Sequence, residues 1–415
     1  MIPILIFIVT DYGGNGFIYG LLGAMYPFFQ FIGAPILGRL SDKIGRKRVL
    51  VISQLGTFVA WVLFLLAFLL PETGLWFQDN EFTGKYTMTL PLLVIFIARI
   101  FDGFTGGNVS VANAYLSDIS TDRDRNTNFG KMGASTSLGF VLGPAVAGIL
   151  ASTVLGEALP LLLAALISLI AIFVINTKLE ESNPCAVDTG TLRLKSFRRF
   201  FQVEHKNCYD VDKGKKVKKN SWKTILAIPG IPLLYAVYFL TFLAFSLFYA
   251  GLPIYANTLL DWTATDLGIF LAYSSFIMIM AQGPLLGRLA KTVSNEALIL
   301  SGSLLLAMGF YLLSSHAVIL IYLANTIFSV GNGIMWPSFL ALLSSTGTKQ
   351  NQGAIQGYGN SMGSIASMLG LILGGMLFEF ISTMVFAIGA AVFLVITLLM
   401  AGRFLQRKKV RPAIN

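Results

Sequence analysis

Charged residues are scarce in this sequence, and histidine and cysteine are scarcer still. Asp, Glu, Lys and Arg make up 12% of the chain, against roughly 25% in a typical soluble domain. Cys185, His205 and Cys208 offer three potential metal ligands, without a fourth and without the spacing of a zinc site. The chain also lacks a glycine-rich phosphate loop and any nucleotide-binding motif. We therefore expect no soluble enzyme, no resident metal and no cofactor.

Long hydrophobic segments fill most of the chain, and hydrophobic residues make up 55% of it. These segments exceed the ~10 residues of a membrane β-strand, so they predict helices that satisfy their own backbone hydrogen bonds in the bilayer. The predicted fold class is therefore an all-α integral membrane protein. Eleven segments are long enough to span it, at residues 15–38, 49–70, 91–116, 130–153, 158–177, 226–256, 266–288, 295–315, 317–343, 354–378 and 381–402.

Basic residues are concentrated in alternate loops. Of the 30 Lys and Arg residues, 28 fall on one side of the predicted membrane, leaving Lys85 on the other side and Arg99 inside it. Because cytoplasmic loops carry the excess of Lys and Arg, this side, with the central loop and the C-terminus, is predicted to be cytoplasmic. The net charge of +10 therefore indicates topology and not binding to nucleic acid. Cys185 and Cys208 fall in the cytoplasmic central loop, where reduced thiols are expected.

Two mutually consistent repeats relate the halves of the chain. The hexad P-x-L-G-R-L begins at Pro35 and again at Pro284, an offset of 249 residues. At an offset of 227, glycines at positions 106, 143 and 148 align with glycines at 333, 370 and 375. Two halves in the same orientation are typical of transporters built from parallel repeats. They predict two six-helix bundles, residues 1–177 and 224–402, with a basic linker at 178–223 and a tail at 403–415.

The first helix departs from this pattern. Met1 to Thr10 is apolar but covers only ~15 Å, half of a bilayer. It is expected to be the outer half of a helix that is truncated at its start, either because the true start lies upstream or because part of the helix has been lost.

The linker contains the basic run Lys213–Lys219, for which two interpretations stay open. The run could contact anionic lipid headgroups, at ~1 kcal/mol per basic residue, or it could be a solvated connection. The expected partners are a small organic substrate, protons and membrane lipids, with no nucleic acid, and the chain is expected to be a monomer.

Arg99 and Asp102 lie inside one predicted helix that runs to about residue 116. Their side chains share a helix face, which continues as a stripe of small and polar residues down to Asn113. A charge at this depth costs ~2.5–3.5 kcal/mol, so the pair must face a bundle interior or a wet cavity. At the offset of 227 the second half has Thr326 and Ser329 instead, so the charges occur once. The pair could merely hold helices together, but the asymmetry favours a role in which Asp102 carries a proton and Arg99 tunes it.

Polar and aromatic side chains recur at helical spacing on other helices and are candidate substrate contacts. An aromatic stripe more often packs a helix than lines a pocket, and both interpretations stay open. Together with the polar positions, such a stripe would suit an amphipathic organic molecule better than an inorganic ion. The candidates are Tyr26, Gln30, Asn113, Tyr238, Phe242, Phe245, Asn325, Asn332, Trp336 and Asn360.

Two motifs carry a family resemblance. They are GRLSDKIGRKR at residues 38–48 and GFVLGPAVAG at residues 139–148. Both resemble signatures of the major facilitator superfamily, most closely of its tetracycline/proton and multidrug antiporter branch, in which Arg99 would be the arginine of the fourth helix. The resemblance covers essentially the whole chain, although the second-half loop is degenerate and has Lys291 opposite Asp42. It implies a major-facilitator-type fold and proton-linked exchange.

The same motifs contain the candidate gating residues, which are Gly38, Asp42, Gly45, Arg46, Gly139, Gly143 and Pro144. The Asp42 carboxylate can pair with Arg46, or cap a neighbouring helix where a negative charge gains ~0.3–1 kcal/mol. Such a contact would hold one conformation and release in the other. The alternative is a plain cytoplasmic turn. The glycines and proline of the later motif are expected to let their helix pack tightly and bend, as a gate or as a purely structural kink.

The sequence as a whole predicts the export of small amphipathic organic molecules in exchange for protons, by alternating access. Two alternatives stay open: a uniporter or symporter that imports a small metabolite, and a non-transporting membrane receptor or scaffold. Flux measurements on sealed vesicles separate transport from scaffolding, and the effect of a pH gradient separates exchange from uniport.

Overall fold

The computed structural model describes residues 2–80, 83–120, 125–182, 222–315, 317–346 and 352–410. Its N-terminal half contains α1 (Ile2–Asp11), α2 (Gly16–Ile44), α3 (Arg46–Ala67), β1 (Gly74–Asn80), β2 (Gly84–Thr89), α4 (Leu90–Gly106), α5 (Val109–Ile119), α6 (Arg125–Ala151) and α7 (Ala158–Lys178). Its C-terminal half contains α8 (Trp222–Leu226), α9 (Ile231–Thr258), α10 (Ala264–Met280), the π-helical segment η3 (Ala281–Leu285), α11 (Leu286–Leu289), α12 (Asn295–Leu312), α13 (Val318–Ser345), α14 (Gln352–Ile381) and α15 (Met384–Val410). The run Lys213–Lys219 and both cysteines lie outside the described residues.

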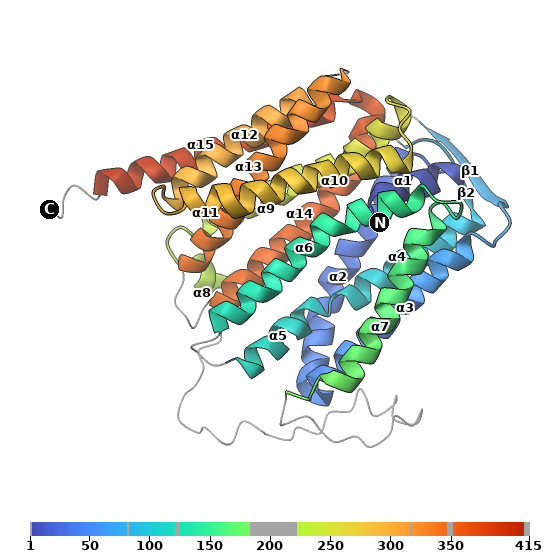
Figure 1. Cartoon of the computed structure of the whole chain (residues 1–415), viewed down its shortest axis with the longest axis horizontal. Helices are drawn as coiled ribbons and strands as arrows, with labels where there is room; N and C mark the ends of the chain where they lie inside the picture. The colour runs from blue at the N-terminus through green and yellow to red at the C-terminus, as the bar shows by residue number, and fades with distance from the viewer. Residues whose placement is uncertain are drawn as a thin grey trace.

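The hydrophobic spans predicted from the sequence are helices. Within the described residues, ten helical segments are long and apolar enough to cross a membrane. The remaining predicted span, residues 130–153, is helical as α6, whose last part is the apolar stretch Leu142–Ala151. Figure 1 shows these helices side by side, with the blue-to-green N-terminal half next to the yellow-to-red C-terminal half.

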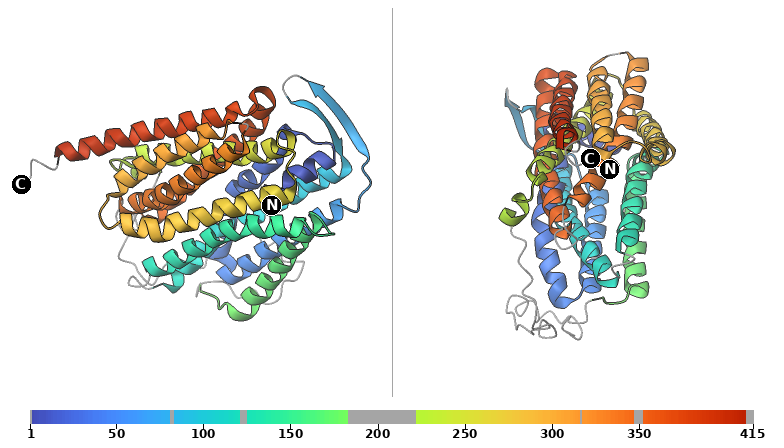
Figure 2. Two further views of the ribbon diagram at one scale, coloured as in Figure 1. Left: turned by 45° about the horizontal axis from the view of Figure 1, so that its top comes forward. Right: turned by 90° about the vertical axis from the view of Figure 1, so that its left-hand side faces the viewer.

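The stretch at residues 71–90, expected to be a loop, forms a β-hairpin at one end of the helices (Figure 2). Strands β1 and β2 pair antiparallel, with Trp76 opposite Met88 and Asn80 opposite Gly84. The Thr87 N–H donates to the carbonyl of Gly13 at 2.8 Å, which anchors the hairpin between α1 and α2. We call this the hairpin end, and the opposite end, where α2 is followed by α3, the linker end.

The two halves meet closely at the hairpin end. Gly148 of α6 faces Gly268 of α10, and a Cβ atom on either residue would overlap the Cα atom of the other. Gly20 of α2 faces Gly375 of α14, and a Cβ atom added to Gly20 would lie 3.2 Å from the Cα atom of Gly375. Small residues allow helix backbones to approach this closely. Two helix pairs, α6 with α10 and α2 with α14, therefore close this end.

Glycines farther toward the linker end lack such contacts. For Gly139 and Gly143 of α6, and for Gly357 of α14, no described neighbour lies within 4 Å of the position of an added Cβ atom. Gly283, which follows α10, is equally open. The expectation that Gly139 and Gly143 pack tightly is therefore wrong for this conformation, and Gly148 makes the close contact instead. The glycine contacts between the halves described here therefore lie at the hairpin end, and none of these four glycines makes one.

Candidate substrate and gating site

Arg99 and Asp102 form a buried ion pair on α4. Arg99 Nη1 lies 3.5 Å from Asp102 Oδ2, and each side chain is 9% exposed. The two side chains lie together because residues three apart share a helix face, and that face is buried. Arg99 Nε is buried and has no hydrogen-bond partner among the described residues. Since a buried ion pair adds little net stability, an incompletely satisfied one is a poor structural fastener, which favours a functional role.

Helix α2 packs against the helix that carries the ion pair. The ring centre of Tyr26 lies 5.8 Å from Arg99 Cζ, within the range of a cation–π contact. Gln30 Nε2 donates to the Gly106 carbonyl at 3.1 Å and to Tyr26 Oη at 3.4 Å. A Cβ atom on Gly103 would lie 2.6 Å from the Tyr26 carbonyl oxygen, so glycine is required where the two helices cross. The predicted small and polar stripe of α4 thus contacts two of the predicted substrate residues.

The predicted helix is interrupted at Gly107 and Asn108, so that two helices, α4 and α5, replace one. Ser110, near the start of α5, donates to the carbonyl of Ala34 in α2 at 2.9 Å. Helix α2 therefore holds the chain on both sides of the break. Asn113 is half-buried on α5 and is separated from the ion pair by this break.

Four predicted substrate residues from three helices form one group, which we call the aromatic cluster. The rings of Tyr238 and Phe242 on α9 stack at 5.0 Å, and the Trp336 ring of α13 packs edge-on against both, at 5.3 and 5.4 Å. Tyr238 Oη donates to Asn360 Oδ1 of α14 at 2.9 Å. Aromatic faces beside an amide can bind a planar organic molecule that also forms hydrogen bonds.

Two other candidates have partners inside the C-terminal half. Phe245 packs against Phe328 and Phe393, with ring centres 5.9 and 5.5 Å apart. Asn325 is fully buried, with its Nδ2 atom 3.5 Å from the Phe270 carbonyl oxygen. Asn325 therefore cannot contact substrate in this conformation, and Phe245 follows the helix-packing interpretation. Helical spacing assigned both to a face of their helix, but spacing does not say which neighbour covers that face.

A cavity of about 50 Å³ lies between the halves, bounded by α6, α9, α10 and α13. Pro144 lines it from the N-terminal half, and Tyr249, Ser274 and Asn332 are among the residues that line it from the C-terminal half. Asn332 Nδ2 lies 3.3 Å from Met278 Sδ. The space suits one or two water molecules, each of which takes about 30 Å³ in the liquid. Ser274 and Met278 were missed by the sequence reasoning, although their spacing of four on one helix is a usable signal.

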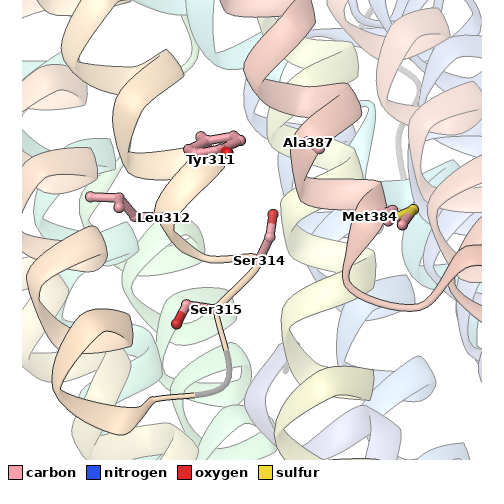
Figure 3. A pocket seen from close by; sticks show the side chains of 6 residues that line it. All are labelled: Tyr311, Leu312, Ser314, Ser315, Met384 and Ala387. Atoms are coloured by element: carbon pink, nitrogen blue, oxygen red, sulfur yellow. The ribbon is translucent and has the colours of Figure 1, made fainter.

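A larger hollow of about 390 Å³ lies between the end of α12 and the start of α15 (Figure 3). It contains no charged side chain and no residue of the aromatic cluster or the ion pair. We therefore do not assign the substrate to it. Its lining residues are Tyr311, Leu312, Ser314, Ser315, Met384 and Ala387.

Arg46, the first residue of α3, connects several helix ends at the linker end. Its Nη1 atom lies 2.6 Å from Asp42 Oδ1, and its Nε atom lies 3.1 Å from Asp118 Oδ2. Glu181 accepts hydrogen bonds from the backbone N–H groups of Arg46 and Lys47, at 2.7 and 3.1 Å. A carboxylate at this position satisfies free amides and complements the helix dipole. The Asp42–Arg46 pair predicted from the sequence is present, and these contacts join the N-terminal half to the start of the linker, without a residue of the C-terminal half.

The two glycines of the same loop differ in what the structure requires of them. Gly45 has a φ of 105°, a backbone conformation that other residues rarely adopt, and it turns the chain from α2 into α3. A Cβ atom on Gly38 would lie 3.6 Å from Ser110 Oγ, which is an ordinary contact. Gly45 is therefore required by this turn, whereas Gly38 is not required in this conformation.

Apolar helices in two halves, with a buried ion pair and a small cavity lined from both halves, are typical of a polytopic membrane transporter. The chain belongs to the Major Facilitator Superfamily, which it matches over residues 1–370 and, in a second match, over residues 234–415. The predicted fold class is confirmed. Proteins of this family transport their substrates and are not enzymes.

Two relatives show where in the family the similarity lies. The chain is 28% identical to the class C tetracycline resistance protein of Escherichia coli over 382 residues, which are 91% of this chain and 85% of the relative. It is 25% identical to multidrug resistance protein 1 of Bacillus subtilis (strain 168) over 406 residues, 94% of this chain and 90% of the relative. The resemblance to the tetracycline and multidrug branch is thereby supported along nearly the whole chain.

Solved structures share the fold at lower identity. The human organic anion transporter MFSD10 (TETRAN) matches with a TM-score of 0.62 and 20% identity, over 92% of this chain and 83% of that one. The xylose transporter XylE from E. coli, in a partially occluded inward-open conformation, matches with a TM-score of 0.66 and 14% identity, over 93% and 87%. At these identities the similarity concerns the fold.

Proposed function

We propose that this chain exports small amphipathic organic molecules in exchange for protons, by alternating access. The observation that carries the proposal is the buried Arg99–Asp102 pair, which occurs in one half of a repeated fold only. An ion pair needed merely to fasten a repeated interface would serve both halves. A single copy fits a task that is performed once per transport cycle.

Asp102 is proposed to carry the coupled proton. It is buried on α4 beside a guanidinium that stays charged, so adding a proton to the carboxylate changes the net charge of the pair. A charge change inside a packed helix interface can bias the balance between two conformations. Arg99 is proposed to set the electric field at this carboxylate, with Tyr26 and Gln30 as its surroundings on α2.

The aromatic cluster is proposed to bind the substrate. Phe242 and Trp336 offer partly exposed rings, and the buried Tyr238 packs against both and donates a hydrogen bond to the exposed amide of Asn360. These groups suit a molecule that is partly planar and partly polar. The names of the two relatives, which refer to tetracycline and to multiple drugs, are consistent with substrates of this class.

The linker end is proposed to face the cytoplasm, because 28 of the 30 Lys and Arg residues belong to that side of the predicted topology. Since the halves are in close contact at the hairpin end, the structure is then proposed to be an inward-facing state. The Asp42–Arg46 pair and the Asp118 carboxylate are proposed to be rearranged when the linker end closes.

The test compares Asp102→Asn with the unsubstituted protein in sealed vesicles. The variant should lose substrate accumulation driven by a pH gradient and keep substrate counterflow without a gradient, because asparagine keeps the shape but cannot exchange a proton. Arg99→Lys should also lose the driven accumulation, since a compact ammonium cannot reproduce the planar guanidinium.

Two outcomes contradict the proposal. If Asp102→Asn still accumulates substrate under a proton gradient alone, the proton is carried elsewhere. If the unsubstituted protein moves no member of a panel of amphipathic compounds in either direction, the chain does not act as an exporter of this class.

A further inference from the structure

Pro253 leaves one backbone carbonyl of α9 without its usual donor. It lies inside this helix, four residues after Tyr249. Because proline has no amide hydrogen, the Tyr249 carbonyl cannot receive the helical hydrogen bond that position 253 would otherwise donate. Within a membrane such a carbonyl must find another partner. The partner is the Tyr19 hydroxyl of α2, which donates to the Tyr249 carbonyl at 2.9 Å.

This hydrogen bond crosses from the N-terminal half to the C-terminal half. Tyr19 is 3% exposed, and its neighbours on α2 contact the other half as well. The Gly16 N–H donates to Glu379 Oε1 of α14 at 2.9 Å. Gly20 makes the close backbone contact with α14 described above. Tyr19 therefore lies within the surface that must separate when the hairpin end opens.

We infer that Tyr19 and Pro253 together form a latch that holds the hairpin end closed. The proline withholds the internal donor, and the tyrosine from the other half supplies the replacement only while the halves are in contact. Opening this end leaves the Tyr249 carbonyl to be satisfied by water that enters the space. The inference rests on the proposed alternating access. It adds that the hydrogen bond from Tyr19 to Tyr249 is present when the hairpin end is closed and absent when it is open.

The partners of this bond explain why it can act as a switch. A second hydrogen bond between the halves at this end, from the Gly16 N–H to Glu379 Oε1, would also be lost on opening, whereas Gly148 with Gly268 and Gly20 with Gly375 are close contacts between backbones. Each has little energy to lose when water replaces it. A hydroxyl–carbonyl bond contributes roughly a two- to ten-fold preference for the state that contains it. Removing it should therefore change the population of states without unfolding the protein.

The test measures the distance between spin labels at the hairpin end of the full chain in lipid nanodiscs. The labels replace exposed residues in each half, Val154→Cys and Met384→Cys, in a background with Cys185→Ser and Cys208→Ser. Tyr19→Phe should reduce the short-distance population relative to the long-distance population roughly two- to ten-fold. The matched control is Tyr255→Phe, which removes a similar bond, from Tyr255 Oη to the Ser315 carbonyl at 2.8 Å, within the C-terminal half alone. The control should leave the distances unchanged.

Pro253→Ala provides the decisive second variant. Alanine restores the amide that can donate to the Tyr249 carbonyl, so the Tyr19 hydroxyl becomes redundant. In this background Tyr19→Phe should cause no further change in the populations. The latch is overturned if Tyr19→Phe leaves the distances as they were, or if its effect is as large in the Pro253→Ala background as in the chain that keeps the proline. The distances require neither substrate nor a proton gradient, so a failure of the proposed antiport would leave this result standing.

Discussion

Replacing Gly148 with alanine should open the hairpin end. The added Cβ atom would overlap the Cα atom of Gly268 on α10, and the next atoms in its way are also backbone atoms. Backbone atoms cannot rotate aside as a flexible side chain does, so α6 and α10 have to move apart. Overpacking of a well-packed interface costs about 1–3 kcal/mol. At 1.4 kcal/mol per factor of ten, the closed hairpin end should become roughly 5- to 140-fold less populated relative to the open one.

The same substitution at Gly139 is the matched control. Gly139 lies on the same helix, and no described neighbour comes within 4 Å of the position of an added Cβ atom. Both variants gain the same helix propensity, about 0.8–1.0 kcal/mol for Gly→Ala. They differ in the contact with α10 alone, so any difference between them reports that contact.

The populations are read from the spin-label distance between Val154→Cys and Met384→Cys, and thermal unfolding is followed in parallel. Gly148→Ala should lengthen the distance, whereas Gly139→Ala should leave it unchanged and keep or raise the melting temperature. The reasoning fails if Gly148→Ala retains the closed distance, or if Gly139→Ala opens the end equally.

Three further outcomes are expected. Asp42→Asn should slow substrate flux while leaving the melting temperature unchanged, because Asp42 is 61% exposed and such a pair contributes about 0–1 kcal/mol to stability. The neighbouring Lys43→Gln should change neither the flux nor the melting temperature. Normal flux in Asp42→Asn would show that this loop is not part of the gate. Phe242→Ala should raise the KM for substrate about five-fold, the effect of losing one aromatic contact of about 1 kcal/mol. Phe245→Ala should mainly lower the melting temperature. Equal KM values for the two variants would contradict the proposal that the aromatic cluster binds substrate. Reporter domains fused after residue 410 should be cytoplasmic, and an external signal there would reverse the proposed orientation.

Features set by local spacing could be predicted from the sequence. The Arg99–Asp102 and Asp42–Arg46 pairs are three and four residues apart, so the helix alone brings their side chains together. Hydrophobicity alone located the membrane helices, because in lipid the backbone has no alternative to internal hydrogen bonding. The aromatic cluster was predicted in part. Spacings of three and four place the aromatic residues of α9 on one face of that helix, but they do not show that Trp336 and Asn360 lie beside it.

Features set by neighbouring helices could not be predicted in the same way. Asn325 and Asn332 belong to one series of residues at spacings of three and four on α13. Asn325 is nevertheless buried against α10, while Asn332 lines a cavity. Gly139 and Gly143 of α6 were expected to pack closely, but within this motif it is Gly148 that meets a partner backbone. The β-hairpin was missed because its short strands were counted as part of a connecting loop. In each case the deciding information is which helix or strand lies opposite.

The repeat explains why the hairpin end closes twice in the same manner. At the offset of 227 residues Gly148 aligns with Gly375, and at the offset of 249 Gly20 aligns with the neighbour of Gly268. The contact of α6 with α10 is therefore the counterpart of the contact of α14 with α2, and each is a glycine meeting a glycine. Such contacts depend on fit and bring little directional energy, so neither can decide by itself which state is populated. The asymmetric features, among them the Arg99–Asp102 pair and the bond from Tyr19 to Tyr249, can bias the balance between the two states. It is in these single-copy residues that substitutions should change the balance of states more than stability.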